Sequence, residues 1–151
     1  MKLRQPEDWG DEAITRWSSA AARRAFEEDR LQEWIEEYLQ VPKWENLGLL
    51  RRVRAYSVEW PAPELVLLDR CDPISGPSPS LMFPKNIQSW ERDVLAILER
   101  GIDVDLMPPL LVWVKPDCRL NLADGNHRVA AAKRLGITKL WALVHPTPLV
   151  G

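Results

Sequence analysis

The stretch DGNHR, residues 124–128, combines a carboxylate, an imidazole and a guanidinium. A carboxylate can hold a magnesium ion or accept a proton, and a histidine can move a proton near neutral pH. An arginine can bind two oxygens of one phosphate group. These side-chain types, so close in sequence, are candidates for acid–base chemistry or for binding an anion.

The elements on either side of this stretch determine where its groups would lie. The alternating segment RLNLAD predicts a strand, and the alanine-rich segment after residue 125 predicts a helix that ends at Gly136. The first N–H groups of a helix lack internal partners and carry the positive end of the helix dipole. A strand that passes directly into a helix through Gly125 would present these N–H groups to an anion, a phosphate above all.

The same residues also have a purely structural interpretation. Asn126 is a good helix N-cap whatever the function, and Asp124 offsets the dipole at that end of the helix. Lys133 and Arg134 lie in the last turn, where positive charge stabilises a helix, and the alanines need only pack closely against a sheet. From spacing alone, both interpretations stay open.

The rest of the chain predicts a mixture of helices and strands. One helix is expected from Asp11 to Gln40, with a break near Ser18-Ser19, and a short helix around residues 47–53. NIQSWERDVLAILERG predicts a helix in which Ile87 and Trp90 share one apolar side and Gly101 forms the end. AYSVEW, ELVLLD, LLVWV and KLWALV predict strands, whereas CDPISGPSPS predicts a loop.

The composition is that of a globular protein. Hydrophobic residues make up 46% of the 151 residues and charged residues 28%, with a net charge of −2. This charge argues against a surface that binds nucleic acid everywhere, but it leaves room for a local basic patch.

No membrane span or secretory signal is expected, and Cys71 and Cys118 have neither disulfide-framework nor zinc spacing, so a cytoplasmic location is the default. The eight tryptophans are interpreted as core and surface anchors.

DGNHRVAAAKRLG resembles the signature turn and helix of the ParB/sulfiredoxin-like superfamily, in which a strand delivers a G-x-H-R or G-E-R-R turn into an alanine-rich helix. The preceding elements follow in the family's order: strand ELVLLD, a loop, the helix that ends at Gly101, MPPLLVWV and RLNLAD. The likeness covers residues 62–145, and outside residues 124–136 it is one of pattern.

The resemblance implies an α/β (α+β) fold, a small mixed sheet flanked by helices. Residues 1–60 would form an N-terminal helical segment, and residues 61–151 a nucleotide-binding domain of the ParB/sulfiredoxin-like type. Carried over by position, the phosphate-binding residues would be Gly125, Asn126, His127 and Arg128. Asp124 would hold Mg²⁺, and Asp124, His127 and Arg128 would be catalytic.

Members of the superfamily differ in chemistry. Sulfiredoxins have a nucleophilic cysteine where this chain has Asn126, and ParB clamps have a DNA-binding domain after the nucleotide pocket, where this chain ends. Free-serine kinases have a similar D-G-H-[HT]-R turn and need a carboxylate from the loop after the first strand, for which Asp72 is a stand-in. The leading hypothesis is Mg²⁺-dependent hydrolysis or phosphoryl transfer with a nucleoside di- or triphosphate such as ATP or CTP.

Two other functions remain as alternatives. One is a ParB-like nuclease or DNA-binding regulator, whose basic residues would be Arg51, Arg52, Arg54, Lys133 and Arg134. The other is a non-catalytic interaction module, in which the acidic N-terminal helix binds a partner protein or a second copy of the chain. The sequence does not choose the nucleotide or the acceptor.

Overall fold

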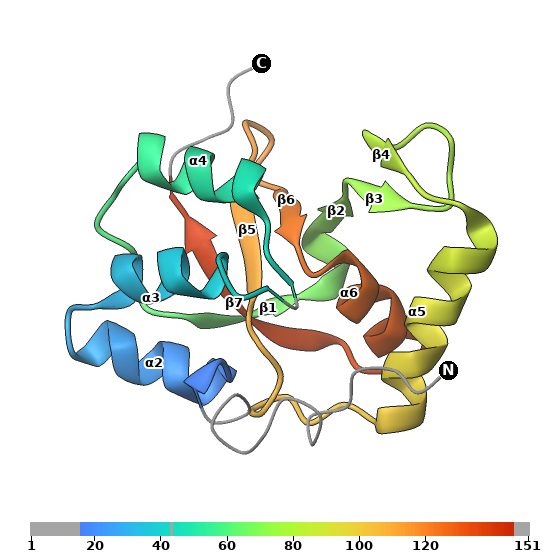
Figure 1. Ribbon diagram of the computed structural model, residues 1–151, viewed down its shortest axis with the longest axis horizontal. Coiled ribbons are helices and arrows are strands. Elements are labelled where there is room, and N and C mark those ends of the chain that lie inside the picture. The colour runs from blue at the N-terminus through green and yellow to red at the C-terminus, as the bar shows by residue number, and fades with distance from the viewer. Residues whose placement is uncertain (1–15, 43, 147–151) are drawn as a thin grey trace.

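The computed structural model describes residues 16–42 and 44–146, and within them a five-stranded mixed sheet has helices on both faces (Figure 1). The strand order is β1-β7-β5-β6-β2. β7 is parallel to β5 and β2 is parallel to β6, whereas the pairs β1–β7 and β5–β6 are antiparallel. The strands are β1 (Glu64–Leu67), β2 (Cys71–Pro73), β5 (Leu110–Val114), β6 (Leu120–Asp124) and β7 (Lys139–His145). The predicted α+β fold class with a mixed sheet is confirmed.

Three helices, α2 (Ser19–Glu27), α3 (Leu31–Tyr38) and α4 (Leu47–Ala55), cover one face of this sheet (Figure 1). Side chains on a strand alternate between faces, so Leu111 and Trp113 of β5 point to these helices. They share a core with the apolar sides of the helices, including Trp34, Ile35 and Val53. The N-terminal helices are thereby packed directly against the sheet.

The long helix expected from Asp11 to Gln40 is divided. The break near Ser18-Ser19 is confirmed, because Ser18 caps α2 by accepting a hydrogen bond from the Ala21 N–H. A second break, which the periodicity does not predict, lies at Asp29, whose φ of 57° is left-handed. The start of the expected helix, at residues 11–15, lies outside the described residues.

The opposite face of the sheet is covered by α6 (Asn126–Arg134), and α5 (Ile87–Arg100) packs against α6. Val129 and Ala132 of α6 contact the side of the sheet that carries Val112 and Leu122. The predicted end of α5 is confirmed, since Gly101 follows it with a φ of 82°. Ile87, expected to share the apolar side of α5 with Trp90, is 67% exposed in the first turn of the helix, whereas Trp90 is buried.

Two local predictions between α4 and α5 are also wrong. AYSVEW forms no strand, because α4 runs to Ala55 and the chain then continues irregularly toward Pro61 and Pro63, which have no N–H to donate. CDPISGPSPS is not all loop, since it holds β2 and β3 (Ser75–Gly76), and β3 pairs with β4 (Phe83–Pro84). β2 forms because β6 offers it a parallel partner. Between β1 and β2 lies the short helix η1 (Leu68–Arg70).

Among the described residues, no helix is long and apolar enough to cross a membrane.

Candidate functional site

A β-bulge at the end of β6 directs Asp124 toward the N-terminal helices. Leu111 of β5 pairs with Asp124, whereas the next residue of β5, Val112, pairs with Leu122, so β6 has one extra residue at Ala123. Paired residues of antiparallel strands share a face, and Leu111 lies in the core below α2–α4. Asp124 therefore faces α3, although strict alternation would place it with Leu122 on the side of α6.

Gly125 joins β6 to α6 in a conformation that other residues avoid. Its φ of 108° lies in the left-handed region, and it is the N-cap of α6. A β-carbon at this position would lie 2.5 Å from Leu110 Cδ2 and 3.1 Å from Arg128 Nη2. The absence of a side chain is therefore required both for the sharp turn and for the close approach of Leu110 and Arg128.

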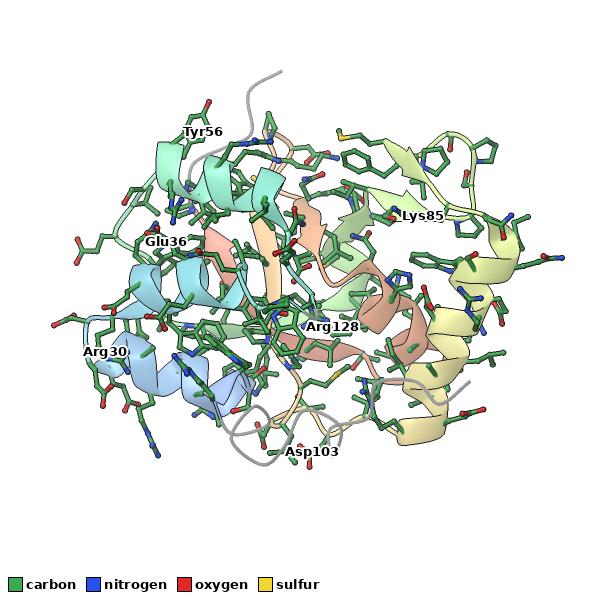
Figure 2. The ribbon with its side chains drawn as sticks, viewed as in Figure 1. Arg30, Glu36, Tyr56, Lys85, Asp103 and Arg128 are labelled. Atoms are coloured by element: carbon green, nitrogen blue, oxygen red, sulfur yellow. The ribbon has the colours of Figure 1, made fainter. Side chains whose placement is uncertain are left out.

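The Arg128 guanidinium is held by acceptors inside the protein. Nη2 donates to Asp124 Oδ2 at 2.9 Å, and Nη1 donates to the carbonyl oxygens of Pro108 and, at 3.1 Å, Pro109. Only 13% of the side chain is exposed. Figure 2 shows it inside the molecule, between the N-terminal helices and α6. Burial lowers the pKa of Arg128, but Tyr38 and Asp124 raise it by more, so the group stays charged.

Tyr38 connects α3 to this ion pair. Its hydroxyl donates to Asp124 Oδ2 over 3.4 Å, so one carboxylate oxygen accepts from both Tyr38 and Arg128. Burial raises the pKa of Tyr38 far above its usual range, which keeps the phenol protonated. The ring of Tyr38 stacks on that of Trp34, with centroids 5.4 Å apart, and is tilted against that of Trp44 at 5.5 Å.

His127 lies on the other side of the first turn of α6. Its ring stacks on that of Trp90, with centroids 4.2 Å apart, and its Nε2 is 3.6 Å from Asp93 Oδ2. Burial lowers the pKa of His127 by more than the carboxylate of Asp93 raises it. The imidazole is therefore neutral at pH 7, able to accept a proton but not a permanent cation.

Asn126 acts differently from the N-cap that the sequence predicts. It is the first residue of α6, and its side-chain oxygen accepts from the N–H groups of Ile74 (3.0 Å) and Ser75 (3.3 Å). Its side-chain amide donates to the Leu122 carbonyl at 3.0 Å. Gly125 occupies the N-cap position instead, because its left-handed backbone begins the turn. Asn126 thus fastens β3 to the end of β6 and α6.

A cavity of about 630 Å³ opens beside this turn. All five predicted residues, Asp124 to Arg128, line it. The other walls come from the end of α5, from the segment that follows it, from α3, and from the segments that precede α2 and follow α3. These lining residues are Trp17, Tyr38, Trp44, Ile97, Arg100, Gly101, Ile102, Asp103, Leu106, Met107 and Pro108. The structure thus places the predicted residues in one pocket, and their predicted roles stay predictions.

Sequence reasoning missed the aromatic wall of this pocket. Trp17, Tyr38 and Trp44 precede the turn by eighty residues or more. Their only sequence signal is an unusual density of aromatic residues in a helical segment, and helical periodicity cannot tell a core side chain from one that lines a cavity. Asp72, the suggested carboxylate of the loop, does not line the pocket and instead binds Lys115 and Arg119.

The predicted Mg²⁺ at Asp124 finds little support in the surrounding side chains. Among the described residues, no group of three or more His, Cys, Asp and Glu side chains could hold a metal ion. One oxygen of Asp124 already accepts from Arg128 and Tyr38. Mg²⁺ prefers several oxygen ligands in octahedral geometry. These side chains do not form a dedicated magnesium site.

Three of the basic residues of the DNA-binding alternative have partners within the protein. Arg54 contacts Glu36 at 2.8 Å, Arg134 contacts Glu91 at 2.5 Å, and the Arg52 guanidinium lies over the ring of Trp113. Each of these cations is matched by an acid or an aromatic ring of the same molecule. The arrangement gives this alternative no specific support.

No known protein family and no curated protein sequence matches the chain. A solved structure of free serine kinase in complex with AMP matches 55% of this chain and 30% of its own, with 19% identity and a TM-score of 0.41. The C-terminally truncated chromosome-partitioning protein ParB from Caulobacter crescentus, complexed with CTP-gamma-S, matches 58% of this chain and 46% of its own, with 19% identity and a TM-score of 0.42. A conserved hypothetical protein from Pyrococcus furiosus matches 55% and 32%, with 18% identity and a TM-score of 0.41.

The matches thus span less than half the length of each of these structures. They include a ParB and a free serine kinase, two kinds of ParB/sulfiredoxin-like protein that the sequence resembles.

Proposed function

We propose that the protein binds a nucleotide in the pocket beside the first turn of α6. The observation that carries this proposal is that one cavity, of about 630 Å³, has both a helix N-terminus and aromatic side chains in its wall. Cavities of about 300–1,000 Å³ are typical for small ligands. A nucleotide is a ligand whose two ends need these two environments.

The phosphate end would lie against the N–H groups of residues 126–128. These groups begin α6. Within the described residues, none of them donates a hydrogen bond to an acceptor outside the helix. Together with the dipole of α6 they favour an anion. Gly125 lines the cavity, and its left-handed backbone places the first turn of α6 at the cavity wall.

The base end would lie against the aromatic wall. Trp17 and Trp44 flank Tyr38, with ring centroids 5.9 Å and 5.5 Å from it, and all three line the cavity. Aromatic rings stack on nucleobases with about 1–3 kcal/mol per base. The N-terminal region would thus bind the base, and the first turn of α6 would bind the phosphate.

The predicted hydrolysis or phosphoryl transfer is a further proposal. Its best-supported participant is His127, whose imidazole is neutral at pH 7 and can take a proton from water or from an acceptor hydroxyl. Arg128 is better suited to holding Asp124 and the turn in place than to stabilising the charge of a transferred phosphoryl group, since its donors already have acceptors.

Calorimetric titration with nucleotides tests the proposal. Leu106 lines the cavity and is 52% exposed, so Leu106→Glu places a carboxylate at the cavity wall with little cost to the core. Leu95, 46% exposed on α5, does not line the cavity and provides a matched control. We expect binding to be lost in Leu106→Glu and kept in Leu95→Glu. Failure of the unchanged protein to bind any nucleotide would overturn the proposal.

A further inference from the structure

The formal charges on the wall of the pocket balance one another. Its lining residues include two arginines, Arg100 and Arg128, and two aspartates, Asp103 and Asp124. Asp124 is bound to Arg128, and Asp103 is fixed in place by the N–H groups of Asp105 and Leu106, which donate to its Oδ1 at 3.0 and 3.1 Å. Figure 2 shows Asp103 at the periphery and Arg128 in the interior.

Neither nearby cationic side chain of the turn is suited to neutralising a highly charged ligand. Arg128 would have to leave Asp124 and two carbonyl oxygens, and burial makes that exchange costly. His127 is neutral at pH 7 because burial lowers its pKa. The N-terminus of α6 contributes roughly half of a positive charge. This suits one phosphoryl group, whereas a wall in which Arg100 and Arg128 are balanced by Asp103 and Asp124 offers no net formal charge to neutralise further phosphoryl groups.

The aromatic wall contains a ring that is held in a fixed orientation. Trp44 Nε1 donates to the Tyr38 carbonyl at 2.9 Å, and Trp44 is only partly buried. A ring that is fixed in this way loses little conformational freedom when a base stacks on it. The affinity of the pocket would therefore depend on the base, in addition to the phosphate.

From these charges and rings we infer that the pocket selects a nucleoside monophosphate over the triphosphate, with the base on the Trp44 ring and without a need for Mg²⁺. This inference rests on the proposed function and specifies its ligand class. The single phosphoryl group binds at the first turn of α6. The wall has no net formal charge, so the charge of each further phosphoryl group stays uncompensated.

Calorimetry on the unchanged chain, with adenosine, AMP, ADP and ATP and the corresponding cytidine series, tests the charge argument. Each titration is done with Mg²⁺ and again with EDTA. The monophosphate of the preferred base should bind at least about tenfold more tightly than its nucleoside and its triphosphate, equally in both buffers. Affinity that rises with each phosphate, or that requires Mg²⁺, overturns the inference while the proposed function stands. No binding in either series overturns both.

Replacing Trp44 tests the stacking argument. Trp44→Ala should weaken the monophosphate about tenfold or more, and Trp44→Phe should restore most of the affinity, because a phenyl ring still stacks. Ribose 5-phosphate, which has no base, should bind more weakly than the monophosphate and be unaffected by either change. An equal loss for both ligands, or none for the monophosphate, would overturn the role of Trp44. Urea unfolding of both variants identifies any loss that comes from the fold.

Discussion

The β5–β6 hairpin has an aspartate bound to basic side chains at each end, but the surroundings of the two clusters differ. At the turn of the hairpin, Asp72 of β2 contacts Lys115 at 2.8 Å and Arg119 at 2.8 Å, and these two basic side chains are 33% and 45% exposed. At the opposite end, Asp124 contacts Arg128 at 2.9 Å, and that side chain is only 13% exposed. The first cluster faces water, and the second lies in the wall of the pocket.

The exposure of each cluster to water determines how much it contributes to stability. In water the two partners of an ion pair can each be hydrated when they separate, so the pair contributes little to stability. In the interior, separation would leave each charge buried without a partner, which is costly. Tyr38 of α3 also donates to the same carboxylate oxygen. The exposed cluster fastens an edge strand, whereas the buried one joins the N-terminal helices, β6 and α6 into one structural unit.

Removal of Asp124 should have the largest effect. Asp124→Ala leaves the buried Arg128 guanidinium without its counter-charge, which should cost about 3–5 kcal/mol of unfolding free energy, measured by urea denaturation. Asp124→Asn, which keeps an acceptor for Tyr38 and Arg128, should lose less. Asp69→Ala is the matched control, since the Asp69 side chain is 99% exposed, and it should change stability by no more than about 0.5 kcal/mol. Equal losses for Asp124→Ala and Asp69→Ala would contradict a stabilising role of the buried ion pair.

Substitution of Gly125 should come next. Gly125→Ala places a β-carbon 2.5 Å from Leu110 Cδ2 and strains a backbone with φ of 108°. We expect a loss of about 2–3 kcal/mol in urea unfolding, together with weaker nucleotide binding. Gly101→Ala separates the two causes, because Gly101 also has a positive φ, of 82°, but a β-carbon there would meet nothing within 4 Å. The prediction is wrong if both variants lose the same amount.

The junction at this site follows from local sequence, and for that reason it could be predicted. RLNLAD, Gly125 and the alanine-rich segment are adjacent in the chain, and their alternation, turn residue and helix propensity agree with the observed β6 and α6. The hairpin from β5 to β6 and the helix α5 also depend on patterns within about fifteen residues.

The remaining features depend on contacts between distant segments. The bulge at Ala123, which turns Asp124 toward α3, leaves no signal in the alternation of RLNLAD. Tyr38 reaches Asp124 only after α3 has packed on the sheet, and β2 needs β6 as a partner. The break at Asp29 is likewise hidden, since the apolar residues of α2 and α3 continue at nearly helical spacing across it. Tertiary packing decides each of these features, so the periodicity of one segment does not predict them.

Removal of the hydrogen bond between Tyr38 and Asp124 should lower the unfolding free energy by less than either change at the turn. Tyr38→Phe keeps the ring stacked on Trp34 but removes a hydrogen bond whose length is 3.4 Å, so about 1 kcal/mol should be lost. Tyr56→Phe, at an exposed tyrosine, is the matched control and should have almost no effect. A double-mutant cycle with Asp124→Ala, which removes the acceptor, measures the coupling directly. Additive losses would contradict a link from α3 to the pocket through this hydroxyl.

The smallest effect is expected at the exposed end of the hairpin. Lys115 and Arg119 donate to Asp72 and lower its pKa from 3.8 to about 2, so the stabilisation from this carboxylate is present above about pH 4 and is lost as the pH falls toward 2. Because the partners are exposed, Asp72→Asn should cost no more than about 1 kcal/mol at pH 7, and less in 1 M NaCl. Urea unfolding of both proteins between pH 7 and about pH 2 should show this difference disappearing as Asp72 is protonated. A difference that persists at pH 2, or that exceeds the loss in Asp124→Ala, would mean that Asp72 acts through packing and not through its charge.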